Sequence, residues 1–203
     1  MKRIPINSTD SPHFIGCWNI ENDDLCSEVI KFFDENHDLQ NIGRRVSGKI
    51  NKEAKDTIDI SIQPKDLVQN KYGIINEYLK ALNKCYEDYI NQWPFLGKFL
   101  TSVDIGSFNI QKYNEGGHIA QVHSERTSIS TLQRILVFLT YLNDVDEGGH
   151  TSFDHYNMDI TPKKGNTIIW PAEWTHAHSG QVVSKGQKYI ITGWMNFSTN
   201  DKD

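Results

Sequence analysis

The spacing of apolar residues in the first half of the chain is mainly helical. Between Ile74 and Ile90 they recur at steps of three and four, which predicts an amphipathic helix with one packing face. A second helix is expected from Asn22 to about Glu35, because asparagine is a favoured N-cap and an apolar side follows it. Three further segments are assigned from alternation or polarity: strands at 14–20 and 57–62, and a loop at 41–57.

From residue 103 onward the pattern changes to short apolar segments separated by turns rich in Gly, Asn and Asp. Eight such segments predict a sandwich or a double-sheet jelly roll with helices outside it. The expected class is therefore α+β with a mainly β core. The predicted strands are 103–113, 118–125, 134–142, 151–153, 157–160, 166–170, 176–183 and 188–197.

Length and composition limit the other possibilities. With 203 residues, we expect one domain over 1–203, with helical support over about 1–100 and the jelly-roll core over about 101–198. No apolar run approaches the roughly 20 residues that cross a bilayer, and the first 14 residues lack the apolar region of a secretory signal. The net charge of -5 and the absence of a basic block argue against nucleic acid as a partner.

The cysteines indicate a cytoplasmic protein. There are three, an odd number, and none forms a CxxC pair. Reduced thiols fit this pattern better than a disulfide framework or a zinc ribbon. The residues concerned are Cys17, Cys26 and Cys85.

Candidate chemistry is concentrated in the second half. His123 and Glu125 are two residues apart, so on a strand both would face the same side. A histidine from 176–178 would complete two imidazoles and one carboxylate, a set that suits non-heme Fe(II) with open coordination positions. Alternation cannot decide between His176 and His178. Lys188 follows, and it offers a fixed cation to a dicarboxylic cosubstrate.

Four blocks in order extend this pattern: QKYNEGGHIAQVHSE, RILVFLTYLNDVDEGGHTSF, PKKGNTIIWP and HSGQVVSKGQKYIITGWMNF. A lone HxE would be weak, but the blocks with these gaps are specific. Over roughly Ile110 to Phe197 the chain resembles the Fe(II)- and 2-oxoglutarate-dependent dioxygenases of the prolyl 4-hydroxylase type. The resemblance implies a double-stranded β-helix, which agrees with the jelly roll expected from strand spacing.

The resemblance also implies roles for residues. The metal ligands would be His123, Glu125 and His178, and the ten-residue step to Lys188 favours His178 over His176. Lys188 would pair with the distal carboxylate of 2-oxoglutarate. The remaining residues implied to line the cosubstrate pocket are Tyr113, Tyr141, Thr192 and Trp194, although both tyrosines also suit a core role.

Two positions depart from the family's pattern. Glu125 stands where the family usually has Asp, one methylene shorter, so the metal site is expected to persist with altered geometry. His150 stands where the GGxT turn usually has Glu, and we expect it at the surface or at a sheet edge. A basic segment with Arg44, Arg45 and Lys49 is either a solvated loop or a substrate lid.

The implied activity is hydroxylation of an unactivated C–H bond with conversion of 2-oxoglutarate and O2 to succinate and CO2. The expected substrate is a peptidyl proline or a related residue in a protein or peptide. Two alternatives stay open: a small-molecule oxygenase acting, for example, on a free amino acid, and a metal-holding jelly-roll module without turnover. The resemblance adds ascorbate as a further cofactor. The sequence does not decide the oligomeric state.

Overall fold

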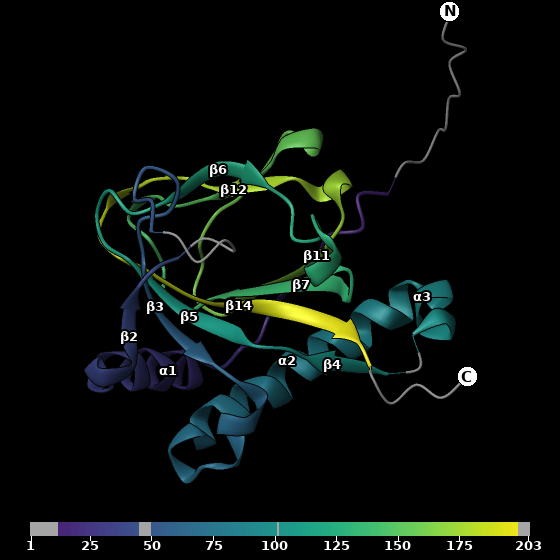
Figure 1. The fold of residues 1–203 in the computed structure, drawn as a ribbon, viewed down its shortest axis with the longest axis horizontal. Helices are drawn as coiled ribbons and strands as arrows, with labels where there is room; N and C mark the ends of the chain where they lie inside the picture. The colour runs from purple at the N-terminus through teal and green to yellow at the C-terminus, as the bar shows by residue number, and fades with distance from the viewer. Residues whose placement is uncertain (1–11, 45–49, 101, 199–203) are drawn as a thin grey trace, which may run out of the picture.

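The computed structural model describes residues 12–44, 50–100 and 102–198. These residues form three layers: helices, a large sheet, and a smaller sheet that contains β6 and β12 (Figure 1). Apolar side chains of the helices and of the outer face of the large sheet form one core cluster. A second cluster lies between the two sheets. The candidate chemistry belongs to this inter-sheet layer.

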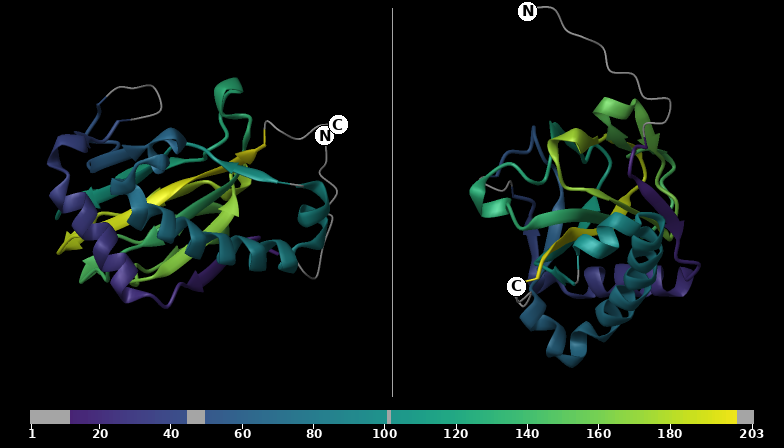
Figure 2. Two further views of the ribbon diagram at one scale, coloured as in Figure 1. Left: turned by 90° about the horizontal axis from the view of Figure 1, so that it is seen from below. Right: turned by 90° about the vertical axis from the view of Figure 1, so that its right-hand side faces the viewer.

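The two predicted helices cover one face of the large sheet (Figure 2). The first, α1 (Asp23–Glu35), begins after Asn22, whose side chain accepts a hydrogen bond from the backbone N of Leu25 at 3.0 Å. The second, α2 (Gly73–Gln92), buries one stripe at steps of three and four, as its apolar spacing predicted. Its buried residues are Ile75, Tyr78, Leu82, Cys85 and Tyr89. A short helix, α3 (Pro94–Phe99), follows and was not predicted.

The large sheet is antiparallel. In the part of the chain that is described, its order is β1-β11-β7-β14-β5-β3-β2, and β4 also pairs with β14. The central strand β14 has the bounds predicted for it and lies between β5 and β7, so it is paired on both sides. The strands are β1 (Gly16–Asn19), β2 (Gln40–Ile42), β3 (Ile58–Ile62), β4 (Val103–Ile105), β5 (Phe108–Tyr113), β7 (Arg134–Tyr141), β11 (Asn166–Pro171) and β14 (Lys188–Phe197).

The smaller sheet faces the large one and has the order β10-β9-β12-β6. Two packed antiparallel sheets with outer helices confirm the predicted jelly roll and the mainly β class. A separate pair, β8 with β13, lies beside them. The strands are β6 (Ile119–His123), β8 (Glu147–Gly148), β9 (Thr151–Phe153), β10 (Met158–Ile160), β12 (His178–Gly180) and β13 (Val183–Lys185).

Some boundaries differ from the expectation. The predicted loop at 41–57 begins inside β2, because β3 supplies a backbone partner that the short sequence Gln-Asn-Ile does not reveal. The predicted strands 103–113 and 176–183 are each divided in two. Strands β1, β2 and β3 come from the first hundred residues, so this part contributes sheet as well as helices. Of the basic segment predicted as either a solvated loop or a lid, Arg45 and Lys49 lie outside the described residues.

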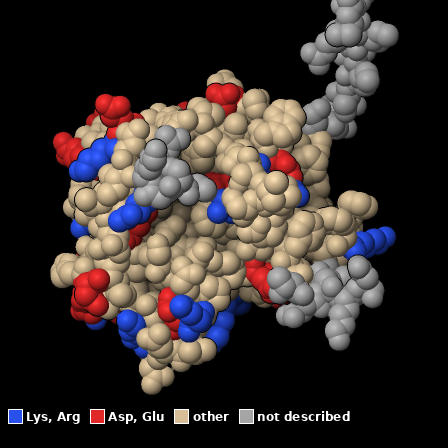
Figure 3. Space-filling model, in the orientation of Figure 1, with Lys and Arg blue, Asp and Glu red and all other residues tan. Residues whose placement is uncertain are grey.

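Within the described ranges, no helix is both long and apolar enough to cross a membrane. Lys and Arg are interspersed with Asp and Glu on the face drawn in Figure 3.

Candidate metal centre and cosubstrate pocket

Three potential metal ligands from two distant parts of the sequence converge in the inter-sheet layer. The Nε2 atoms of His123 and His178 each lie 3.5 Å from Oε1 of Glu125. One ligand atom from each residue lies within 4.8 Å of the others. His123 and His178 are paired across β6 and β12, which brings their ring centroids to 4.5 Å. The fold therefore assembles the two histidines, and the carboxylate joins them.

Glu125 joins the cluster from a turn, whereas the sequence predicted that it would lie on the same strand as His123. Strand β6 ends at His123, so Glu125 lies two residues beyond it and is not related to His123 by strand alternation. The chain turns after His123, and the backbone N of Arg126 donates to the carbonyl of Ala172 at 3.0 Å. This bond fixes the segment that carries Glu125 against the segment that leads to His178.

The histidine rings are oriented by hydrogen bonds on their far sides. Nδ1 of His123 lies 2.9 Å from the carbonyl oxygen of Gln121, and Nδ1 of His178 lies 2.9 Å from that of His176. A carbonyl oxygen only accepts, so each Nδ1 carries the proton and donates it. In the neutral rings, both Nε2 lone pairs are then free to bind a metal.

The two carboxylate oxygens of Glu125 have different surroundings. Oε1 faces the imidazoles. Oε2 accepts a hydrogen bond from Nε1 of Trp194 at 2.9 Å and lies 3.4 Å from Nη1 of Arg134. The same Nη1 donates to the backbone carbonyl of Glu125 at 2.9 Å. One oxygen therefore faces the histidine pair, and the other is held by two donors.

Electrostatics keep Glu125 ionised. Burial alone would raise the pKa of its carboxyl, but His123 and His178, when protonated at Nε2, donate hydrogen bonds that outweigh burial and hold the pKa well below its usual range. For His123, burial lowers the pKa, and the bond to Glu125 more than offsets it, so the net direction is upward. Protons and a metal cation therefore compete for the Nε2 atoms of the two histidines and for Oε1 of Glu125.

The donor set fits a divalent metal of the non-heme iron type. Two imidazole nitrogens and one carboxylate oxygen on one side, without a thiolate among them, is the arrangement used by Fe(II) enzymes with open positions. The carboxylate is ionised, and both rings have their far nitrogens occupied by carbonyls. These features match what a metal requires of its ligands and of the groups behind them.

Lys188 is the predicted cosubstrate cation, and it is buried with only 2% of its surface exposed. Its Nζ donates to the carbonyl of Gly149 at 2.9 Å and lies 4.1 Å from the ring centroid of Tyr113, its partner across β14 and β5. In the described residues no carboxylate is paired with Lys188. Burial lowers its pKa to about 7. A bound anion would therefore supply the negative charge that the buried Lys188 amine lacks among the described residues.

The other predicted cosubstrate residues share the inner face of the large sheet, but their polar groups are engaged. Tyr113 donates to Oε1 of Gln111 at 2.6 Å. The hydroxyl of Tyr141 is hydrogen-bonded to Oγ1 of Thr151 at 2.5 Å. Thr192 donates to the carbonyl of Phe138 at 2.8 Å. Trp194, also predicted to line the cosubstrate pocket, donates from Nε1 to Oε2 of Glu125 at 2.9 Å.

A buried polar network beside Tyr113 was missed by sequence reasoning. Asp59, on β3, accepts from Nζ of Lys55 at 2.6 Å and from Thr57 at 2.7 Å. The side-chain amide of Gln111 lies 3.5 Å from the same carboxylate. A signal was available, because Asp59 is a charged residue within the alternating strand Ile58–Ile62. Arg134 was also missed, although it carries the same kind of signal: it is a charged residue at the start of the apolar strand β7.

His176 stands apart from the cluster. It lies in a tight turn, Trp174–His176, and not on a strand. Its Nε2 contacts the carbonyl of His13 at 2.7 Å and the hydroxyl of Tyr156 at 3.4 Å. Its ring therefore connects the segment before β1 to this turn, while its carbonyl orients His178.

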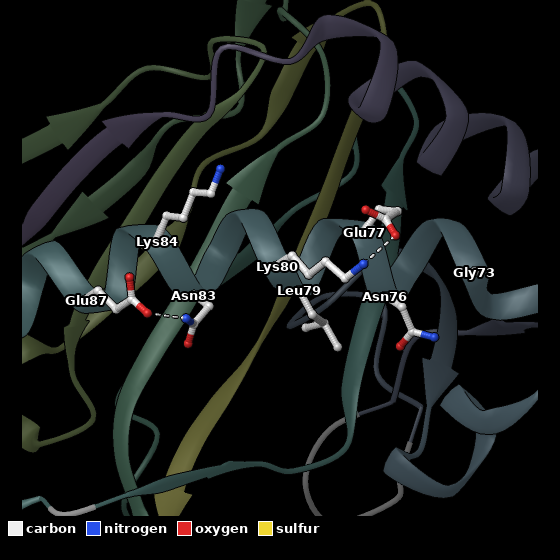
Figure 4. Close-up of a pocket in the computed structure, with 8 residues that line it drawn as sticks. All are labelled: Gly73, Asn76, Glu77, Leu79, Lys80, Asn83, Lys84 and Glu87. Carbon is white, nitrogen blue, oxygen red and sulfur yellow. Dashed lines mark hydrogen bonds and ion pairs between the residues drawn. The ribbon is translucent and has the colours of Figure 1, made fainter.

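A separate hollow lies along one face of α2 (Figure 4). Most of its lining residues are polar or charged, and they include an ion pair between Lys80 and Glu77 at 2.8 Å and a hydrogen bond from Asn83 to Glu87 at 2.7 Å. All its lining residues come from this one helix. It contains none of the candidate metal or cosubstrate residues.

Comparison with known proteins agrees with this geometry. Residues 108–196 match the family model of the 2OG-Fe(II) oxygenase superfamily. Prolyl 4-hydroxylase 13 of Arabidopsis thaliana is 28% identical over 121 residues, which are 47% of this chain and 44% of that protein. Prolyl 4-hydroxylase subunit alpha-2 of Gallus gallus is 30% identical over 89 residues, 38% of this chain and 17% of that protein. The chain thus spans less than half the length of these curated relatives.

Solved structures share the fold. A prolyl-4-hydroxylase from Pseudomonas putida aligns with a TM-score of 0.68 at 18% identity, covering 92% of this chain and 94% of the other. A prolyl hydroxylase from Trichoplax adhaerens was solved with a peptide fragment of the hypoxia inducible factor oxygen degradation domain. It aligns with a TM-score of 0.71 at 13% identity, covering 91% of this chain and 84% of the other.

Proposed function

We propose that this chain is an Fe(II)- and 2-oxoglutarate-dependent hydroxylase of the prolyl 4-hydroxylase type, because residues 108–196 match the family model of the 2OG-Fe(II) oxygenase superfamily. The observation that carries the proposal is the cluster of His123, Glu125 and His178, with one ligand atom from each residue within 4.8 Å of the others. The buried Lys188 supports the choice of cosubstrate, because a dicarboxylate would supply the anion that this amine lacks.

Each residue has a defined part in this proposal. His123 and His178 would hold the iron through Nε2, and Glu125 through Oε1. Bound iron with its cosubstrate supplies the oxidising chemistry that inserts oxygen into a C–H bond. The Lys188 ammonium would orient the distal carboxylate of 2-oxoglutarate beside the Tyr113 ring. The apolar core between the sheets, including Phe153 and Trp170, would exclude water.

We propose a peptidyl proline as the substrate, supported by the relatives named prolyl 4-hydroxylases and by the neighbour solved with a peptide. The test is to incubate the chain with Fe(II), 2-oxoglutarate and a panel of proline peptides and free amino acids. Succinate formation together with one added oxygen on a peptide supports the proposal. Oxygen gained only by a free amino acid points to the small-molecule alternative. If no 2-oxoglutarate is consumed in the presence of Fe(II), the chain is a metal-holding module.

Two narrower proposals accompany this one. A reducing, cytoplasmic location is supported by Cys17, Cys26 and Cys85, which are free thiols. Burial raises the pKa of Cys26 and of Cys85 to about 11, so these two are poor nucleophiles. Ascorbate is proposed from the resemblance, and its test is whether turnover declines faster without it.

A further inference from the structure

The carboxylate of Glu125 is held from behind by Arg134 and Trp194. We propose that these two are positioning residues, which fix the longer glutamate side chain so that Oε1 alone is directed to the metal. The proposal rests on the proposed function, because it concerns the same metal centre. It explains how a glutamate can serve where the family usually has an aspartate.

The first support is that the two carboxylate oxygens of Glu125 have different contacts. Oε1 lies 3.5 Å from both imidazole Nε2 atoms, whereas Oε2 is bonded to Trp194 at 2.9 Å and lies 3.4 Å from Arg134. Turning Oε2 toward the histidines would require both contacts to break. Charge-assisted hydrogen bonds of this kind are stronger than neutral ones.

The second support is the rigidity of the two donors. Trp194 lies in the central strand β14, and Arg134 lies at the start of the neighbouring strand β7. The guanidinium carbon of Arg134 is 3.6 Å from the ring centroid of Trp194, so the cation stacks on the indole. The side chains of Arg134 and Glu125 are each 13% exposed, which limits competition from water. By contrast, Glu125 itself lies beyond the end of β6 and has no strand to fix it.

The third support is side-chain length. An aspartate at position 125 would withdraw its carboxylate by about one C–C bond, roughly 1.5 Å. The contacts of 2.9 Å and 3.4 Å would then lengthen beyond hydrogen-bond range unless the backbone moved. The surroundings are therefore matched to glutamate, and the aspartate usual in the family is expected to bind metal less well here.

The experiment compares Mn(II) affinity, measured without oxygen by electron paramagnetic resonance of the free ion, in matched tryptophan variants. Trp194→Phe removes the indole N–H but keeps an aromatic ring. Trp18→Phe is the control, because its Nε1 also donates to a carboxylate at 2.9 Å, that of Asp88, on the helical side of the molecule. We expect Trp194→Phe to weaken Mn(II) binding about tenfold, the lower end of the effect of removing a ligand's partner, and Trp18→Phe to change it less than about twofold.

Two further variants separate positioning from a general loss of structure. Arg134→Gln should weaken Mn(II) binding, whereas Lys80→Gln, which loses an ion pair with Glu77 on α2, should not. Glu125→Asp should weaken binding in the natural chain and cost less in the Trp194→Phe background, where the bond is already absent. Bound Co(II) should change its visible absorption bands in Trp194→Phe and keep them in Trp18→Phe.

The outcomes distinguish this inference from the proposed function. If folded Trp194→Phe and Arg134→Gln both bind Mn(II) like the natural chain, the positioning inference is wrong, and the hydroxylase proposal stands provided that 2-oxoglutarate is still consumed. An additive loss for Glu125→Asp and Trp194→Phe also contradicts it. If the natural chain binds no Mn(II), both proposals fail.

Discussion

The ammonium of Lys188 lies 4.1 Å from the ring centroid of Tyr113, and both side chains are buried between the sheets. The lysine is paired with a carbonyl and an aromatic face, and neither carries a full negative charge. A buried cation in such surroundings weakens the fold, because its desolvation is only partly offset. This relationship links stability to cosubstrate binding at one residue.

Replacing Lys188 with methionine is therefore expected to have opposite effects on stability and on turnover. The variant fills a similar volume without a buried charge, so its melting temperature at pH 6 should rise. The KM for 2-oxoglutarate should increase at least about tenfold, because the distal carboxylate loses its cation. Thermal unfolding and succinate formation measure the two effects. A lower melting temperature with an unchanged KM would contradict both parts.

The pH dependence of unfolding provides a second prediction. In the folded state the pKa of Lys188 is about 7, compared with 10.5 for an ordinary lysine. Between these values the unfolded chain binds a proton that the folded chain lacks, so the free energy of unfolding rises with pH. Below pH 7 both states are protonated and the destabilisation is complete. Urea titrations from pH 7 to 9 should show this rise in the natural chain and a smaller one in Lys188→Met. The cysteines, whose thiols ionise in the unfolded chain near this range, contribute equally to both proteins, so the difference between them reports Lys188.

Cosubstrate binding should take up a proton over the same window. At pH 8.5 the amine is mostly neutral, and a bound carboxylate favours its charged form. The heat of 2-oxoglutarate binding to the metal-loaded chain should therefore depend on the ionisation enthalpy of the buffer at pH 8.5 and much less at pH 6. Equal buffer dependence at the two pH values would show that Lys188 is not the group that titrates.

The elements predicted best are those whose packing repeats regularly in sequence. Helix α2 buries Ile75, Tyr78 and Leu82 at steps of three and four, and the long strand β14 has the predicted bounds, Lys188–Phe197. Strand β2 was missed because its three residues, Gln40, Asn41 and Ile42, pair through the backbone with β3, and backbone pairing leaves no trace in side-chain polarity.

The site was predictable in its residue types and less so in its contacts. The spacing of His123, Glu125 and His178 gave a set that the structure assembles. The hydrogen bond from Trp194 to Glu125 was not predicted, because that contact depends on how β14 lies against a turn 69 residues earlier. Register between distant strands and the course of a turn are tertiary properties, so a single sequence does not specify them.

The ion pair between Lys55 and Asp59 allows a test of stability away from the metal site. Their side chains are 12% and 10% exposed, and Asp59 also accepts from Thr57. Asp59→Leu should lower the free energy of unfolding by about 3 kcal/mol, because it leaves a largely buried lysine without its partner. The double variant with Lys55→Met should recover much of this loss. Lys52→Met, in an exposed pair with Asp56 at 3.6 Å, should cost less than about 1 kcal/mol.

Glu125→Ala tests the metal site most directly. It removes the carboxylate from the cluster and leaves the donors of Arg134 and Trp194 without their acceptor. Succinate formation dependent on Fe(II) should fall more than about 100-fold, and stability should decrease by about 1–3 kcal/mol, the cost of unpaired buried donors. Glu115→Ala, an exposed glutamate in the turn before β6, is the matched control and should retain turnover. Full succinate formation by folded Glu125→Ala would remove Glu125 from the ligand set.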